Sequence, residues 1–109
     1  MADSTVSTLF HATPARNLRS IFRTGLQPAL ATGKLKAVWL HEKGKRRWAV
    51  AHVADRHSTP VRQLAVIEVR IPRADLRRNR SGVWTCARVI RPDEIHGVNG
   101  LRIALASAR

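Results

Sequence analysis

The amino-acid sequence predicts a single compact domain of the α+β class, in which two facing sheets have two main helices at their side. Its 109 residues are 44% apolar, which is enough for one hydrophobic core and too few for two. The predicted elements run strand, helix, strand, helix and then several short strands, an order that argues against a doubly wound parallel sheet. No glycine-rich fingerprint follows the first strand, so a Rossmann turn is not expected.

The N-terminal half is expected to contain both helices. After a flexible tail over residues 1–5, the first strand covers residues 6–12. Thr13 is a preferred N-cap residue, and Pro14 suits the first helical turn. Apolar residues at helical spacing then predict a helix as far as Gly25, which favours a helix end. The elements that follow are a loop over 27–36, a strand over 37–41 and a second helix over 47–57.

The C-terminal half is expected to be mainly β-structure. Alternating and β-branched apolar residues predict a strand over residues 63–71, which Pro72 ends. Residues 96–106 alternate well enough for a last strand, although Asn99-Gly100 could instead turn this segment into a hairpin. Between them we expect a helical turn over 73–77, a turn over 79–82, strands over 83–86 and 88–90, and a turn over 92–95.

The net charge is the strongest functional signal in the composition. Lys and Arg number 20 against 7 Asp and Glu, so the chain carries +13 at neutral pH. Such self-repulsion destabilises a folded chain unless a partner neutralises it. Nucleic acid, RNA or DNA, is the favoured partner, because phosphates bound by Lys and Arg release counterions. The alternative is a merely solubilising basic surface, whereas no basic helix with a clean apolar face points to a membrane.

Several other classes of protein are not indicated. Cys86 is the only cysteine, so no intramolecular disulfide can form and a cytoplasmic location is expected; the role of this thiol stays open. We recognise no secretory signal and no stretch of transmembrane length. The histidines are not spaced as metal ligands, so no metal site is expected. His52 and His57 are interpreted as helix-face residues, and the tryptophans as mainly core residues, one of which could stack on a base.

The first strand and the first helix meet at a corner that could carry chemistry. His11 and Thr13 place an imidazole and a hydroxyl beside the unpaired backbone N–H groups expected at a helix start. Such a corner can bind a ribose hydroxyl, an amide or a phosphate. The alternative interpretation is that Thr13 only caps the helix and that His11 only ends the strand.

Short motifs also follow one another in an order known from one superfamily. In chain order they are L-F-H-A-T, N-L-R-S-I-F-R-T-G-L, V-W-L-H, W-A-V-A-H-V, V-I-E-V, S-G-V-W-T-C and R-P-D-E-I. In this order they resemble the ADP-ribosyltransferase superfamily, and within it the NAD-binding half of the RNA 2'-phosphotransferases. The resemblance covers about residues 11–95. It includes the H-G-T corner of that family, here His11-Ala12-Thr13, and a late G-V-W segment, here Gly82-Val83-Trp84.

The resemblance implies a split β-sandwich with NAD in the cleft between its sheets. It implies that His11 and Thr13 contact a ribose and the nicotinamide amide, and that Arg16 and His41 also belong to the cofactor site. It further implies a part in catalysis for His11 and Arg78. The residues expected to bind nucleic-acid or cofactor phosphates are Lys34, Lys36, Arg77, Arg78, Arg80 and Arg88.

The expected function is therefore an NAD-dependent ADP-ribosyl transferase or 2'-phosphotransferase-like enzyme that acts on a nucleic acid, RNA more than DNA. Two departures from the family keep alternatives open. Its N-terminal lobe, which supplies an Arg and a His, has no counterpart in the sequence, and its catalytic Glu has only Glu94 as a candidate. The alternatives are a non-catalytic nucleic-acid-binding domain of the same fold and a toxin-like protein ADP-ribosyltransferase.

Overall fold

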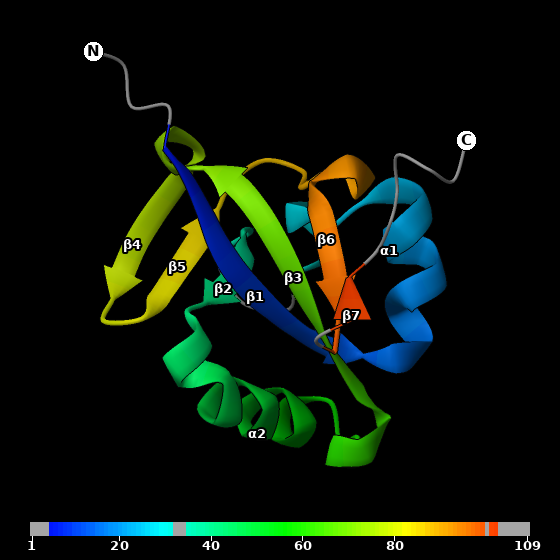
Figure 1. Cartoon of the computed structure of the whole chain (residues 1–109). Coiled ribbons are helices and arrows are strands. Elements are labelled where there is room, and N and C mark those ends of the chain that lie inside the picture. Colours follow the sequence, from blue (N-terminus) through cyan, green and yellow to red (C-terminus); the bar gives the residue numbers. More distant parts are fainter. Residues whose placement is uncertain (1–4, 32–34, 100, 103–109) are drawn as a thin grey trace.

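Seven strands and two α-helices make up the described part of the chain, which covers residues 5–31, 35–99 and 101–102 of a computed structural model (Figure 1). The helices are α1 (Leu18–Thr24) and α2 (Arg46–Arg56). This content confirms the α+β class and the two main helices. The strands are β1 (Val6–Pro14), β2 (Val38–His41), β3 (Leu64–Pro72), β4 (Leu76–Arg80), β5 (Val83–Cys86), β6 (Ile95–Val98) and β7 (Leu101–Arg102).

The described strands form one antiparallel sheet with the order β4-β5-β2-β1-β3-β6-β7. β1 and β3 pair along their whole nine-residue lengths. Among the described residues, β1 and β2 pair only where Phe10 lies opposite His41. Figure 1 shows β4 and β5 running across the direction of β1 and β3. The two sheets expected from the sequence are therefore two parts of one hydrogen-bonded sheet, and a single residue pair joins them.

The hydrophobic core lies on one face of the β1–β3 ladder. Ile67, Val69 and Ile71 alternate along β3 and are fully buried. Glu68 and Arg70 lie between them, point to the other face and form an ion pair of 3.6 Å. Each buried side chain of this size stabilises the fold by roughly 1.5–3 kcal/mol. The core is completed from other elements by Leu9, Ile21, Leu26, Val38, Leu40, Cys86, Ile90 and Ile95.

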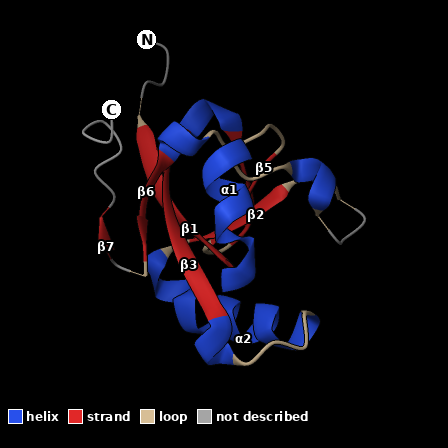
Figure 2. Cartoon of the chain, turned by 90° about the vertical axis from the view of Figure 1, so that its right-hand side faces the viewer, coloured by secondary structure: helices blue, strands red, loops and turns tan. Residues whose placement is uncertain are grey.

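Both helices lie beside the sheet, as the sequence predicts. α2 packs against β1 and β3, and α1 packs against a 3-10 turn over Pro92–Glu94. Figure 2 shows α1 in front of the strands and α2 below them. Within the described residues, neither helix has the length and apolarity that crossing a membrane would require.

The start of α1 differs from the prediction, whereas its end agrees with it. Thr13 and Pro14 continue β1 and pair with β3, and α1 begins at Leu18 after a 3-10 turn over Ala15–Asn17. The predicted N-cap role of Thr13 is wrong, because the β1–β3 ladder keeps its backbone in a strand. Gly25 ends the helix with a φ of 86°, a left-handed conformation that glycine adopts at little cost.

Strand β4 was missed by the sequence interpretation. Residues 76–80 pair with β5, although a helical turn over 73–77 and a turn over 79–82 were expected. The segment L-R-R-N-R has no alternation of apolar and polar residues, so no pattern marks it as a strand. Its backbone hydrogen bonds to β5 hold it in place, and the side chains of its three arginines are exposed.

The segments after β5 were predicted in part. The strand expected over residues 88–90 is reduced to one bridge between Ile90 and Leu26. β6 and β7 pair as the hairpin that was the alternative for the last strand. Residues 1–4 of the tail expected over 1–5, and residues 103–106 of the expected last strand, lie outside the described residues.

Replacing Gly25 by Ala should destabilise the fold by more than ~1 kcal/mol. The positive φ disfavours a side chain, and a Cβ at this position would collide with the carbonyl oxygen of Ile90. Gly44→Ala is the matched control, because a Cβ there would meet nothing within 4 Å. Urea unfolding of both variants measures the difference, and equal losses of stability would contradict this account of the helix end.

Candidate functional site

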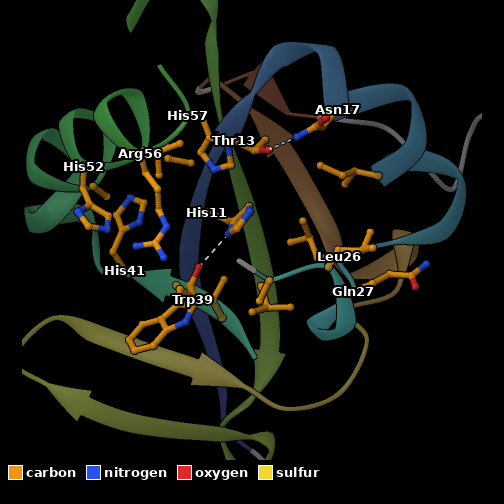
Figure 3. Close-up of a pocket in the computed structure, with 18 of the residues that line it drawn as sticks. His11, Thr13, Asn17, Leu26, Gln27, Trp39, His41, His52, Arg56 and His57 are labelled. Atoms are coloured by element: carbon orange, nitrogen blue, oxygen red, sulfur yellow. Dashed lines mark hydrogen bonds between the residues drawn. The ribbon is translucent and has the colours of Figure 1, made fainter. Parts of the chain in front are cut away.

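A cavity of about 610 Å³ lies over β1 and β2, with α2 on one side and α1 on the other (Figure 3). Its volume is in the range of pockets that bind small molecules and cofactors. Ile21, Leu26 and Val53 contribute apolar walls. The lining residues with polar or aromatic side chains are His11, Thr13, Asn17, Ser20, Gln27, Trp39, His41, Trp48, His52, Arg56, His57 and Arg80.

His11 is held in a defined orientation inside this cavity. It stands on β1 opposite Ile67 of β3, and its Nδ1 lies 2.8 Å from the carbonyl oxygen of Trp39. Because a carbonyl oxygen only accepts hydrogen bonds, Nδ1 carries the proton of the neutral ring and Nε2 is left as an acceptor. Burial lowers the pKa of His11; the hydrogen bond to Trp39 opposes this effect and nearby His57 adds to it. At neutral pH His11 is therefore an uncharged acceptor.

Thr13 lies two residues further along β1, on the same face as His11. Its side chain is buried, and its Oγ1 accepts a hydrogen bond of 3.1 Å from Nδ2 of Asn17 (Figure 3). Asn17 belongs to the 3-10 turn that leads into α1. Because Oγ1 accepts this bond, the Thr13 hydroxyl can direct its own proton at a ligand. The predicted corner therefore exists, but a strand and a side-chain amide build it instead of an N-cap.

His41 is a buried polar group whose second ring nitrogen has no partner. Its side chain is 3% exposed, and Nε2 makes no hydrogen bond to any described residue. Burial lowers the pKa of His41 to about 4, and electrostatic interactions with nearby His11 and Arg46 add to this effect. Buried polar atoms are nearly always satisfied, so an unpaired atom at a cavity wall marks a position where a ligand can bind.

The polar lining of the cavity is cationic or neutral. Four of the five histidines in the chain line it, together with Arg56 and Arg80. No carboxylate is found among the described residues that line it. A concave site lined by guanidinium groups attracts anions, and such groups bind phosphate oxygens in pairs. The cavity is therefore suited to a ligand that carries phosphate.

Two tryptophans border the cavity and are not core residues, contrary to the sequence interpretation. Trp39 is 41% exposed and Trp48 is 44% exposed. The Trp48 ring stacks on His52 of the same helix, with centroids 5.4 Å apart and planes at 12°. Trp84, in contrast, packs against the core as expected, and its Nε1 donates to Glu42 at 2.9 Å.

The predicted site residues fall into two groups. The structure brings His11, Thr13, His41 and Arg80 together in the cavity lining. It places Arg16 outside the lining, where Nη1 lies 3.4 Å from the Thr59 hydroxyl. Arg16 was expected in the same site as His11, but it does not line this cavity.

The other predicted basic residues lie around the cavity or away from it. Lys36 donates from Nζ to the carbonyl of Ala31 at 2.8 Å, and Ala31 borders the cavity. Arg77 and Arg78 are exposed on β4 and do not line the cavity. Lys34 lies outside the described residues.

Arg88 and Glu94 form an internal ion-pair network instead of a binding site. Both guanidinium Nη atoms of Arg88 lie 2.8 Å from the two carboxylate oxygens of Glu94, and Nη2 also lies 2.9 Å from Asp75. Burial alone would raise the pKa of Glu94, but hydrogen bonds from Arg88 and the Arg91 backbone hold it below its usual value. Neither residue lines the cavity. Arg88 is therefore not placed to bind a ligand phosphate there, and Glu94 is not placed to act as a base there.

Sequence reasoning missed the contribution of α2 to the site. Trp48, His52 and Arg56 all line the cavity, and each follows the previous one after four residues. Residues at this spacing share one face of a helix, so the pattern itself was available. These residues are aromatic or charged, whereas the small apolar residues of the same segment mark the face that packs on the sheet, so the pattern alone does not show that Trp48, His52 and Arg56 face a cavity.

No metal site was found within the described residues, since no group of three or more His, Cys, Asp or Glu side chains could hold an ion. Cys86 is buried in the core, and burial raises the pKa of its thiol. The buried thiol therefore serves packing in this fold.

Stability should fall as the pH is lowered from 6.5 towards 4, because the unfolded chain then binds a proton that folded His41 does not. For a pKa of about 4 the full loss is up to roughly 3 kcal/mol. His41→Gln should reduce the pH dependence between 6.5 and 5, above the range in which carboxylates titrate, and leave the part that His11 contributes. Urea unfolding at several pH values measures both slopes, and parallel slopes would refute the assignment to His41.

Glu94→Gln should destabilise the fold by about 2–4 kcal/mol, since Arg88 would lose its buried carboxylate partner. Asp93→Asn is the matched control, because Asp93 is exposed and pairs only at 3.4 Å with Arg91 among the described residues. Thermal or urea unfolding distinguishes the variants. Equal stability of the two would remove the structural role assigned to Glu94.

Comparison with known proteins adds no assignment of family to this geometry. Neither the known protein-family models nor the curated protein sequences gave a match to the chain. The conclusion about function therefore depends on the cavity and on the motifs that the chain itself carries.

Proposed function

We propose that the chain binds NAD in this cavity and acts on a nucleic acid, RNA in preference to DNA, as an NAD-dependent ADP-ribosyl transferase or a 2'-phosphotransferase-like enzyme. The observation that carries the proposal is the neutral, oriented His11 beside Thr13 in a cavity that Arg80 also lines and whose described lining has no carboxylate. A dinucleotide combines these needs, because it has ribose hydroxyls and an amide as well as a pyrophosphate.

The residues of the lining fit such a ligand. Nε2 of His11 would accept a hydrogen bond from a ribose hydroxyl, and the Thr13 hydroxyl would donate to the amide oxygen. Arg56 and Arg80 would bind the pyrophosphate with paired hydrogen bonds. The partnerless Nε2 of His41 would gain a ligand atom in the same cavity. Trp39 is exposed enough for one of the aromatic rings of the ligand to stack on it.

The sheet supports the proposed split β-sandwich as the finer description of the fold. β4, β5 and β2 form one part of the sheet, and β1, β3, β6 and β7 form the other. The cavity lies where these parts meet, since both His11 of β1 and His41 of β2 line it. A cleft at the join of two such parts is where the resemblance to ADP-ribosyltransferases would position the dinucleotide.

The chemistry supplied by NAD is an ADP-ribosyl group joined to nicotinamide by a C–N bond, which breaks as an acceptor oxygen bonds to the ribose carbon. Residues of the chain would hold the ribose and the pyrophosphate in position and stabilise charge. The described lining offers no carboxylate to remove a proton from the acceptor. A phosphate oxygen is already anionic and needs no such base, so a phosphate-bearing nucleic-acid acceptor suits this cavity.

Binding of NAD should raise the melting temperature of the protein by several degrees when NAD is present far above its Kd. His11→Ala should abolish this rise, because the ribose would lose its oriented acceptor. His96→Ala is the matched control, since His96 is partly buried and lies outside the lining of the cavity. A thermal-shift series with NAD, ADP-ribose and nicotinamide measures the effect, and no rise at millimolar NAD would defeat the proposal.

Labelled NAD offered with RNA, DNA and protein acceptors tests the reaction itself. The proposal expects nicotinamide release together with label on the nucleic acid. Label on protein alone would favour the toxin-like protein ADP-ribosyltransferase, and nucleic-acid binding without release would favour a non-catalytic domain of the same fold. Both of these outcomes overturn the proposed transfer to nucleic acid.

A further inference from the structure

Three planar side chains gather at the edge of the cavity. The Trp48 ring stacks on His52 at 5.4 Å, and the guanidinium carbon of Arg80 lies 5.4 Å from the centre of the Trp48 ring. All three residues line the cavity, and Trp48 is 44% exposed. We name Trp48, His52 and Arg80 the rim platform. An exposed tryptophan ring at the edge of a cavity offers a surface on which a planar group can stack.

The rim platform is built by two elements that are distant in sequence. Trp48 and His52 are four residues apart on α2, and Arg80 ends β4. Gly82, in the turn after β4, accepts a hydrogen bond of 2.9 Å from the backbone N–H of Glu42, and a Cβ on it would meet the side chain of Lys45, the residue before α2. The contact between Arg80 and Trp48 therefore places the end of an arginine-rich strand beside α2 at the cavity.

Strand β4 continues the positive charge away from the rim platform. It is an edge strand of the sheet, and Arg77, Arg78 and Arg80 on it are exposed. None of these three arginines forms an ion pair with a carboxylate in the described part of the chain. Arg78 instead lies 6.0 Å from the Trp84 ring, which leaves its N–H groups available for anions.

Charged residues on an edge strand also protect a sheet against aggregation, and this function alone would account for arginines on β4. It does not account for an exposed tryptophan beside a histidine and an arginine at the mouth of a cavity. The combination of stacking rings with a row of unpaired arginines is the arrangement that binds single-stranded nucleic acid.

We propose that this surface binds single-stranded nucleic acid, with a base stacked on the rim platform and the phosphate backbone along β4. This inference deepens the proposed function, because it places the acceptor strand next to the cavity. Single-stranded chains are favoured over duplexes, because only an unpaired base can offer its face to Trp48. Arg77 and Arg78 project to opposite faces of this edge strand, so together with Arg80 they would contact phosphates of a chain that runs along its edge and contribute to affinity regardless of sequence.

The binding experiment uses a labelled single-stranded RNA of about 12 nucleotides without NAD, and the duplex of the same sequence. Fluorescence anisotropy should show tighter binding of the single strand at equal salt. Trp48→Ala should weaken that binding roughly tenfold, whereas Trp48→Phe should keep most of it because a ring remains. Equal affinities for single strand and duplex, or an unchanged affinity of Trp48→Ala, would overturn the proposal.

The contribution of β4 is tested separately by salt dependence. Arg78→Ala should weaken binding and reduce the slope of log K against log salt by about 1. Arg23→Ala is the matched control, because Arg23 is exposed on α1 and should leave the affinity and the slope closer to those of the unaltered protein. Equal effects of the two substitutions would indicate that the nucleic acid is attracted by the net charge of the protein alone, and would contradict binding of its phosphates along β4.

A spectroscopic measurement reports the stacked base directly. The chain has 3 tryptophans, so Trp39→Phe combined with Trp84→Phe leaves Trp48 as the only emitter. Its fluorescence should be quenched by single-stranded RNA and unaffected by polyglutamate, which supplies negative charge without bases. Quenching by both, or by neither, would contradict the stacking.

The outcome for this surface can be separated from the outcome for the reaction. If RNA binding depends on Trp48 but no nicotinamide is released, the proposed binding surface is supported and the proposed transferase activity is contradicted. If nicotinamide is released but RNA binding does not depend on Trp48, the transferase activity is supported and the binding surface is contradicted.

Discussion

The ladder between β1 and β3 is the constraint on which the rest of this structure depends. Its antiparallel pairing spans both strands completely and puts the apolar face of β3 into the core. The same alternation directs His11 and Thr13 of β1 to the face that carries the cavity. Because the ladder continues through Pro14, it also overrides the local preference of Thr13 for a helix start. Fold stability and site geometry therefore come from one set of hydrogen bonds.

The cavity concentrates histidine and arginine in a chain that is already strongly basic. Burial resolves part of this conflict, since it keeps His11 and His41 uncharged at neutral pH. Internal ion pairs resolve another part, because Arg88 is neutralised by Glu94 and Asp75. Arg80 at the cavity and the other β4 arginines form no ion pair with a carboxylate in the described part of the chain. An anionic ligand or partner would relieve the repulsion that these groups share.

Much of the fold followed from local signals in the sequence. The apolar alternation of residues 63–71 predicted β3, and Gly25 marked the end of α1, because both signals act within a few residues. Strand β4 could not be predicted, since the segment L-R-R-N-R gains its structure only from pairing with β5. The same limit applies to the site. His11, Thr13, His41 and Arg80 were predicted, whereas Asn17, Trp48 and Arg56 required the packing of α2 and the turn before α1 beside β1.

The sequence by itself determined the α+β class, the two helices, the core face of β3 and the excess of positive charge, because composition and periodicity carry these properties. Only the tertiary structure decided which basic residues form internal ion pairs and which line the cavity. Arg88 and Arg80 look alike in sequence, yet one lies between two carboxylates and the other stacks on Trp48. The physical reason is that a charged side chain pairs with the groups that the fold brings close to it, and the pairing of the strands sets which groups those are.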